Sequence, residues 1–279
     1  MGSCREAFSR IESEMPEDQL CEPKFVTVPQ FLQIILEKYW SELGWVFRGQ
    51  DNIEWPLRPK AGRDEFYLKA TSAWVEKGQS SSDLGRFNHW REQAVAYTDA
   101  LPQNDFECLA FAQHYGLATR LLDWSTNPLV ALYFAVEMQG ETDGAVFCHM
   151  PWFIIDRKNS AIDREFDRVA LLTPRPFDRR IAAQSGVFTF HFHPERALTA
   201  TQVNEEAREA APDGVDLVTI RVPVKAKPSL LRQLNQIGIN RKYLFPDLEG
   251  LSEFVNWETR RTVDSRERRK AKENEPGTA

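Results

Sequence analysis

Apolar residues recur at helical spacing through much of the first half of the chain. From Val28 to Leu43 they return every three or four positions, Pro29 suits a first helical turn, and Gly44 follows the last periodic residue. This pattern predicts a helix. Comparable spacing and end signals predict further helices at Asp64 to Lys77, Leu84 to Leu101, Asp105 to Tyr115, Pro128 to Met138, Pro228 to Gly238 and Asp247 to Trp257.

Strand-like runs are short and lie mostly in the second half. The first, Trp45-Val46-Phe47, is an apolar run that is expected to deliver Arg48-Gly49-Gln50 to a turn. Three later strands are predicted at Gly144 to Met150, Val187 to His193 and Val215 to Val222. Helices gathered early and strands gathered late favour an α+β fold, with a small, partly antiparallel sheet flanked by helices, over alternating βαβ units.

The chain divides into one main domain and two polar ends. Residues 1–25 are rich in Glu, Ser and Pro and are expected to form a flexible lead-in, whereas residues 26–257 carry the periodic segments. Residues 258–279 form a charged tail that is expected to be a solvated helix extension or disordered. A contact with nucleic acid or with another protein, if one exists, would use the basic residues of this tail.

Net charge and cysteine spacing narrow the classes of function. A formal charge of −6 and a pI near 5.5 give no overall attraction to nucleic acid or anionic lipid. The four cysteines are widely separated without a CxxC pair, so neither a zinc knuckle nor a disulfide framework is indicated. With no apolar run near the roughly 20 residues that span a bilayer, we expect a cytoplasmic protein without membrane contact. No metal site is expected, although His191 and His193 alternate on a predicted strand.

Polar residues are unusually dense in the stretch 111–137, where they lie between two apolar helical segments. A buried polar group without a partner costs roughly 1–3 kcal/mol, so packing alone is a poor explanation for such a cluster. A functional site is the natural interpretation. Its polar and aromatic members are His114, Tyr115, Arg120, Asp123, Trp124, Ser125 and Asn127.

Several motifs together resemble the FRG domain family, which is named for a Phe-Arg-Gly motif. The resemblance extends over roughly Val26 to Trp257. Its motifs are Phe47-Arg48-Gly49-Gln50, Leu57-Arg58-Pro59, the run from His114 to Trp124, Asn127-Pro128 with Ala131 to Ala135, and Leu244 to Leu251. A further stretch around Gln184-Ser185-Gly186 also resembles the family.

A second resemblance is to one class of ADP-ribosyltransferases. In that class a strand presents Arg-Gly, a second strand carries Ser-Thr-Ser, an Ala and a Phe follow on the next helix, and a late Glu is catalytic. Here Arg48-Gly49 is similar to the first element, Asp123-Trp124-Ser125 with Ala131 and Phe134 to the second, and Asp247-Leu248-Glu249 to the third. The resemblance implies an ADP-ribosyltransferase-like architecture and NAD⁺ as substrate. Asp123, however, stands where the first Ser is usual.

Under this resemblance the candidate catalytic residues are Arg48, His114, Asp123 and Glu249. A guanidinium suits a pyrophosphate, an imidazole suits a general base, and a carboxylate suits a ribose that develops positive charge. Candidate binding residues are Gly49, Gln50, Arg58, Tyr115, Arg120, Trp124, Ser125, Asn127 and Gln184. Structural roles remain open for several of them: Arg48 as an ion-pair partner, Trp124 as a core residue, and Asn127 as a helix N-cap.

The leading interpretation is therefore a bacterial FRG-domain protein that cleaves NAD⁺ or transfers ADP-ribose to a macromolecule, as a toxin or phage-defence effector. Two other classes stay open. One is a phosphoesterase or nuclease that uses His114 as base and Asp123 as acid or metal ligand. The other is a non-catalytic module that binds a nucleotide, a nucleic acid or a protein through Arg48, Arg58 and Arg120.

Overall fold

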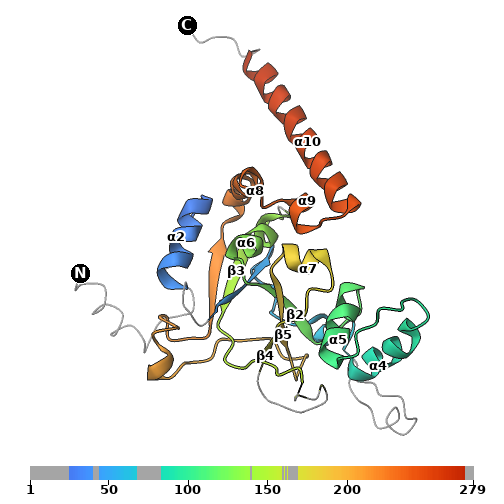
Figure 1. Cartoon of the computed structure of the whole chain (residues 1–279). Coiled ribbons are helices and arrows are strands. Elements are labelled where there is room, and N and C mark those ends of the chain that lie inside the picture. Colours follow the sequence, from blue (N-terminus) through green and yellow to red (C-terminus); the bar gives the residue numbers. More distant parts are fainter. Residues whose placement is uncertain are drawn as a thin grey trace.

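The computed structural model describes residues 25–39, 44–67, 83–138, 140–158, 160, 162 and 169–273. Its centre is one sheet of six strands in the order β4-β5-β2-β1-β3-β6, and every neighbouring pair is antiparallel (Figure 1). The strands are β1 (Val46–Gln50), β2 (Leu121–Ser125), β3 (Gly144–His149), β4 (Ala170–Leu172), β5 (Gly186–Phe190) and β6 (Leu217–Val222). The open sheet with flanking helices confirms the α+β fold.

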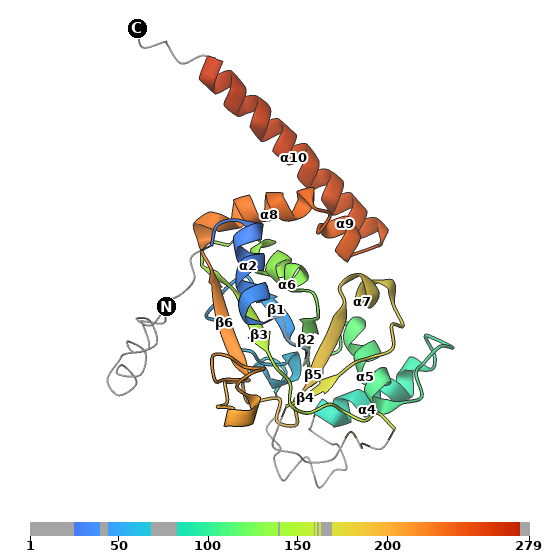
Figure 2. The same ribbon diagram turned by 60° about the vertical axis from the view of Figure 1, so that its left-hand side comes forward.

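Helices cover the sheet in two groups (Figures 1 and 2). The first is α2 (Val28–Lys38), α6 (Pro128–Val136) and α8 (Lys227–Gln236), whose apolar faces share one core with β1, β3 and β6. The second is α4 (Asp83–Ala94) and α5 (Asp105–His114), which pack against β2, β4 and β5. The remaining helices are α7 (Arg179–Ala183), α9 (Arg241–Leu244) and α10 (Leu248–Glu273), with short 3-10 turns at Lys60–Gly62, Glu205–Ala207 and Val224–Ala226.

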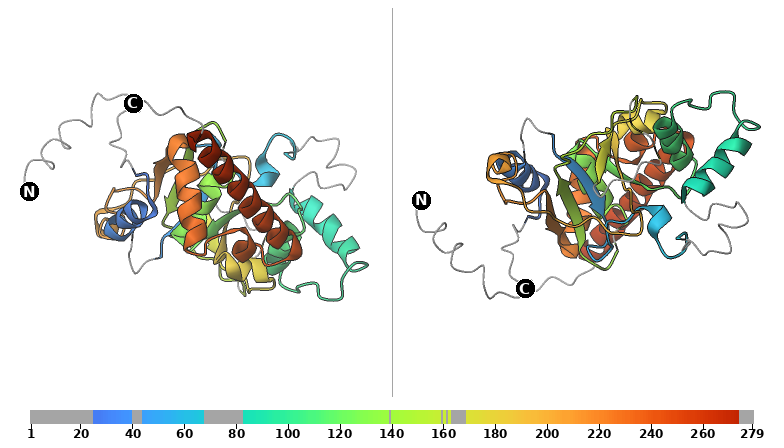
Figure 3. Two further views of the ribbon diagram at one scale, coloured as in Figure 1. Left: turned by 90° about the horizontal axis from the view of Figure 1, so that it is seen from above. Right: turned by 90° about the horizontal axis from the view of Figure 1, so that it is seen from below.

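The long helix α10 extends away from the rest of the molecule (Figures 1 and 2), and seen from above it runs diagonally across the other elements (Figure 3). It begins one residue after the predicted start at Asp247 and continues to Glu273, so the first part of the charged tail is helical. Within the described residues, none of the helices combines the length and apolarity needed to cross a bilayer. The lead-in before residue 25 lies outside the described part of the chain.

Several predicted boundaries were wrong. The first helix ends at Lys38, capped by Tyr39, instead of reaching Leu43. Arg48-Gly49-Gln50 belongs to β1 and is not a turn, because all three residues pair with β3. The segment 84–101 is helical only to Ala94, and residues 64–66 form a turn, while 68–77 lie outside the described residues. The strand predicted to His193 ends at Phe190, so His191 and His193 do not alternate on it.

Gly49 lets α6 lie directly against β1. A Cβ atom built on Gly49 would stand 1.8 Å from the carbonyl oxygen of Ala131 and 2.7 Å from the amide nitrogen of Ala135, both in the α6 backbone. Neither atom is the end of a flexible side chain, so a methyl group requires the helix to move off the strand. The missing side chain of Gly49 thus admits a helix backbone.

We predict that Gly49→Ala lowers the free energy of unfolding by about 3 kcal/mol or more, because overpacking a rigid contact costs about 1–3 kcal/mol and here the obstacle is backbone. Urea denaturation measures the change. Gly186→Ala in β5 is the matched control, because its Cβ would meet nothing closer than 3.4 Å. Equal stability of the two variants would contradict the close packing of α6 on β1.

Two buried imidazoles lie where β3 and β5 end. His149 is 3% exposed and His191 is 1% exposed. Burial, together with the smaller effects of the neighbouring His149 and Arg48, lowers the pKa of His191 to about 3. Burial also lowers the pKa of His149, which a hydrogen bond to Asp216 opposes. Both rings are therefore neutral inside the folded protein at neutral pH.

His191 should make the fold sensitive to acid. Its folded pKa lies below the unfolded value of 6.5, so its contribution to stability is complete above pH 6.5 and falls as the pH drops toward 3. The loss is at most about 1.4 kcal/mol per pH unit. We predict that His191→Gln flattens the decline of unfolding free energy between pH 6.5 and 4.5, measured by urea titration. His89→Gln, at an exposed position of α4, should retain the wild-type decline. An unchanged slope for His191→Gln would contradict the prediction.

Candidate functional site

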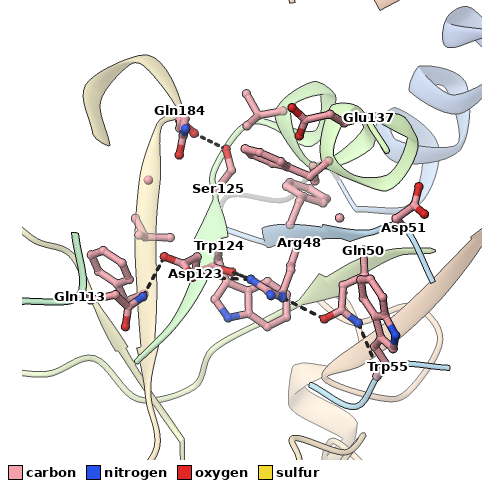
Figure 4. A pocket seen from close by; sticks show the side chains of 18 of the residues that line it. Arg48, Gln50, Asp51, Trp55, Gln113, Asp123, Trp124, Ser125, Glu137 and Gln184 are labelled. Atoms are coloured by element: carbon pink, nitrogen blue, oxygen red, sulfur yellow. Dashed lines mark hydrogen bonds and ion pairs between the residues drawn. The ribbon is translucent and has the colours of Figure 1, made fainter. Parts of the chain in front are cut away.

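A large cavity lies beside the point where β1 meets β2. These strands pair only at Phe47 with Ser125, whereas β1 pairs with β3 over five residues. The cavity has a volume of about 800 Å³, and its walls come from β1, β2, β5, α6, α7 and the segment 55–65 (Figure 4). Strand β2 carries Asp123, Trp124 and Ser125.

Arg48 bridges the two strands inside this cavity. Its Nη1 donates to the carbonyl oxygen of Asp123 at 2.7 Å, and its Nε donates to Oε1 of Gln50 at 3.3 Å (Figure 4). The side chain is only 17% exposed. Burial lowers the pKa of Arg48, the Asp123 carboxylate raises it, and the nearby Arg63 lowers it. A guanidinium whose charge is poorly solvated favours an anionic partner, provided that one fits into the cavity.

Asp123 presents its carboxylate to solvent at the mouth of the cavity. Its side chain is 65% exposed, and Oδ1 accepts a hydrogen bond from Nε2 of Gln113 at 2.9 Å. The other oxygen lies 3.9 Å from Nη1 of Arg48. His114 also lines the cavity, but its Nε2 lies 3.6 Å from Asp178. The structure records no direct His114–Asp123 contact among the described residues.

Most of the candidate residues come together at this cavity. Those that line it are Arg48, Gly49, Gln50, Arg58, His114, Asp123, Trp124, Ser125 and Gln184. Ser125 donates its hydroxyl to the carbonyl oxygen of Gln184 at 2.7 Å, while Nε2 of Gln184 donates to the carbonyl oxygen of Leu244 at 3.0 Å. Gln184, which caps the end of α7, is thereby joined to β2 and to α9.

Four candidates lie outside the cavity lining. Arg120 makes a two-pronged ion pair with Asp83, with both N–O distances at 2.7 Å. Asn127 caps α6 by accepting from the amide of Leu129. Tyr115 is 67% exposed beyond the end of α5, and Glu249 is exposed in the first turn of α10. The structural role considered for Asn127 is therefore observed, and the late carboxylate does not reach this cavity.

Glu137 is a cavity residue that the sequence analysis missed. It follows the last residue of α6, accepts from Arg241, and lies 3.3 Å from the hydroxyl of Tyr133. Burial raises the pKa of Glu137, and Arg241 opposes this effect. Phe245 separates two cations at the same wall, with the guanidinium carbon of Arg180 4.0 Å and that of Arg241 3.7 Å from its ring centre.

No signal in the sequence marks Glu137 as part of a site. It follows an apolar helical run, where a single Glu is an ordinary residue at a helix end. Its partner Arg241 is 104 positions away, so only the fold brings them together. Trp55 and Arg180 also line the cavity and were not identified. Among the described residues there is no group of three or more His, Cys, Asp or Glu side chains placed to hold a metal ion.

A buried ion pair beside the cavity connects the end of β1 to α8. Nζ of Lys227, in α8, donates to Oδ1 of Asp51 at 2.8 Å and to its carbonyl oxygen at 2.6 Å. Lys227 is 1% exposed and Asp51 is 6% exposed. The second carboxylate oxygen accepts from the amide of Gly140 at 3.2 Å. Asp51 lines the cavity directly after β1, so this pair ties the end of β1 to α8.

Comparison with known proteins identifies the domain. Residues 44–144 match the family model of the FRG domain, so the chain contains an FRG domain, and the family's function is uncertain. No curated protein and no solved structure matches the chain. The three letters of the motif have distinct places here: Phe47 is buried in the main core, Arg48 lies in the cavity, and Gly49 lies under α6.

Removing the ammonium of Lys227 leaves the Asp51 carboxylate buried without its counter-charge, and such half-broken pairs cost about 3–5 kcal/mol. We predict a loss of this size in the unfolding free energy of Lys227→Met, measured by chemical denaturation. Combining it with Asp51→Asn should restore part of the loss. Lys225→Met, at an exposed position two residues earlier, is the control. A Lys227→Met protein as stable as this control would contradict the assigned role of the pair.

Proposed function

We propose that the cavity binds NAD⁺ and that the protein cleaves its nicotinamide–ribose bond, releasing ADP-ribose or transferring it to a macromolecular acceptor. One observation carries the proposal. Arg48-Gly49 on β1, Asp123 to Ser125 on β2, and Ala131 with Phe134 on α6 all line a single cavity. These segments were matched to ADP-ribosyltransferase elements by sequence alone, and they come from different parts of the chain.

The cationic side of the cavity suits the pyrophosphate. Arg48 is held in place by hydrogen bonds to Asp123 and Gln50, and Arg58 and Arg63 line the same cavity. Nε of Arg58 is buried and has no hydrogen-bond partner among the described residues. Guanidinium groups bind phosphate oxygens through paired, charge-assisted hydrogen bonds. Arg48 and Arg58 are therefore assigned to the pyrophosphate oxygens.

Aromatic side chains provide surfaces for the two rings of NAD⁺. Trp55 is 48% exposed beside Gln50, and Phe134 and Phe245 form the wall next to Glu137. Stacking on such surfaces binds flat heterocycles without requiring a charge. We therefore assign adenine to the exposed Trp55 and nicotinamide to the part of the cavity beside Phe134 and Glu137.

Glu137 is assigned the carboxylate role that the sequence resemblance gave to Glu249. It lines the cavity, and Arg241 holds it in position. When the bond between nicotinamide and ribose C1′ breaks, the electron pair leaves with nicotinamide and the ribose becomes positively charged. A fixed carboxylate stabilises that charge and accepts a ribose hydroxyl hydrogen bond. An oxygen of water or of the acceptor then bonds to C1′ and releases its proton.

Arg48→Lys tests the binding step. A lysine keeps the charge but loses the fork that contacts both Asp123 and Gln50, so NAD⁺ should bind about 10-fold more weakly or worse by calorimetry. Arg175→Lys, whose side chain is 76% exposed outside the cavity, should bind as the wild type does. NAD⁺ binding that is equal in all three proteins would remove the assigned site.

Glu137→Gln tests the chemical step. Nicotinamide release, followed by chromatography with and without cell extract, should fall by about 100-fold or more while NAD⁺ affinity changes little. Glu249→Gln is the matched control and should retain wild-type turnover, because that carboxylate is exposed on α10. Loss of turnover in the Glu249 variant alone would return the catalytic role to that residue. Binding of NAD⁺ without turnover by the wild type would instead favour a non-catalytic binding module.

A further inference from the structure

A second cavity lies behind the ends of β3 and β5, away from the one just described. Its volume is about 590 Å³, and residues 196–199 and 201–204, which follow β5, form part of its lining. His149 and His191 belong to its wall, together with the aromatic residues Trp152, Phe153 and Phe192. None of the lining residues is shared with the first cavity, so the proposed NAD⁺ site does not account for it.

His149, in the wall of this cavity, carries a buried hydrogen-bond acceptor. Its Nδ1 lies 2.9 Å from the backbone carbonyl oxygen of Asp216. A carbonyl oxygen can only accept, so the ring proton is on Nδ1, and Nε2 of the neutral ring carries a lone pair. Nε2 is buried and has no hydrogen-bond partner among the described residues. Such an atom is costly to bury unless a donor reaches it.

The ring of His149 is fixed before any ligand arrives. The Trp124 ring lies 5.4 Å from it, centre to centre, and Nε1 of Trp124 donates to Oγ1 of Thr189 at 2.9 Å. The same Thr189 oxygen lies 2.9 Å from Nε2 of His191. These contacts hold both imidazoles in one wall, and the position of the free acceptor is therefore defined.

The remaining lining narrows the chemistry of the ligand. Trp152 is 41% exposed, so its indole offers a flat surface at the cavity, and Phe192 adds a second aromatic side chain. Arg196 lines the cavity with a side chain that is 63% exposed. A deep acceptor, aromatic surfaces and an outer guanidinium together match a nucleotide, with its base inside and its phosphate outside.

We propose that the second cavity binds the base of a nucleotide, which donates an N–H to Nε2 of His149, lies against Trp152 and directs its phosphate toward Arg196. The proposal goes beyond the NAD⁺ site, because it concerns a different cavity and a ligand held by different residues. Stacking on Trp152 tolerates any base, whereas the single acceptor requires a base with an N–H at its edge.

Titration calorimetry with AMP, GMP, CMP and UMP, each tested separately, examines this proposal. At least one should bind the wild-type protein with a Kd below about 1 mM, which corresponds to a binding free energy of about −4 kcal/mol. Trp152→Ala should weaken that binding about 10-fold by removing the stacking surface. This residue is partly exposed, and the substitution should leave the fold intact. Tyr97→Ala, at a position that is 87% exposed and lines neither cavity, is the matched control and should bind the same nucleotide with wild-type affinity.

His149→Phe examines the acceptor itself. It keeps a ring of similar shape and removes the lone pair, so the affinity should fall about 10-fold or more. If the variant does not fold, ¹⁵N spectra of the wild-type imidazoles give the same information, because the Nε2 resonance of His149 should move when the nucleotide binds.

Three outcomes would overturn the proposal. The first is that none of the four nucleotides binds below 1 mM. The second is that Trp152→Ala binds as tightly as the wild type, or that the His149 resonance does not move. The third is that Arg48→Lys weakens nucleotide binding as much as Trp152→Ala does, which would place the ligand in the first cavity. The NAD⁺ proposal is judged separately by nicotinamide release, so either proposal can fail without the other.

Discussion

The close contact of α6 with β1 at Gly49 positions the α6 side of the first cavity. Because the helix backbone touches the strand without an intervening side chain, Phe134 and Glu137 reach the same space as Arg48. A helix held one side-chain layer farther away would separate these groups. In the motif, Arg48 carries the charge, and the next residue, Gly49, lets the helix approach the strand.

Arg48 illustrates how one residue serves both structure and binding. Strands β1 and β2 pair at a single position, and the guanidinium joins them again by donating to the Asp123 carbonyl oxygen. This bond consumes one N–H, and Gln50 takes another. The alternatives considered from sequence, a structural partner or a ligand-binding group, are therefore compatible, because a guanidinium has five N–H donors.

Local signals in the sequence were sufficient where the structure depends on local interactions. Asn104 and Asn127 cap α5 and α6 as their types suggest, and both helices begin where predicted. Arg48-Gly49-Gln50 was wrongly predicted as a turn, since glycine and polar residues favour turns, yet pairing with β3 makes it strand. The nine cavity-lining candidates follow from recognised motifs. Glu137 could not be found, because its significance depends on Arg241, a residue remote in sequence.

A chain of hydrogen bonds connects the linings of the two cavities. Trp124 lines the first cavity, and through Thr189 it contacts His191, which lines the second. The hydrogen-bonded side chains of Trp124, Thr189 and the neutral His191 carry no formal charge. They therefore do not repel the guanidinium groups of the first cavity. Burial keeps these imidazoles neutral, and a protonated ring so close to Arg48 would add a second positive charge. Burial is thus the main cause of the low pKa of His191, and the positive charge of Arg48 acts in the same direction.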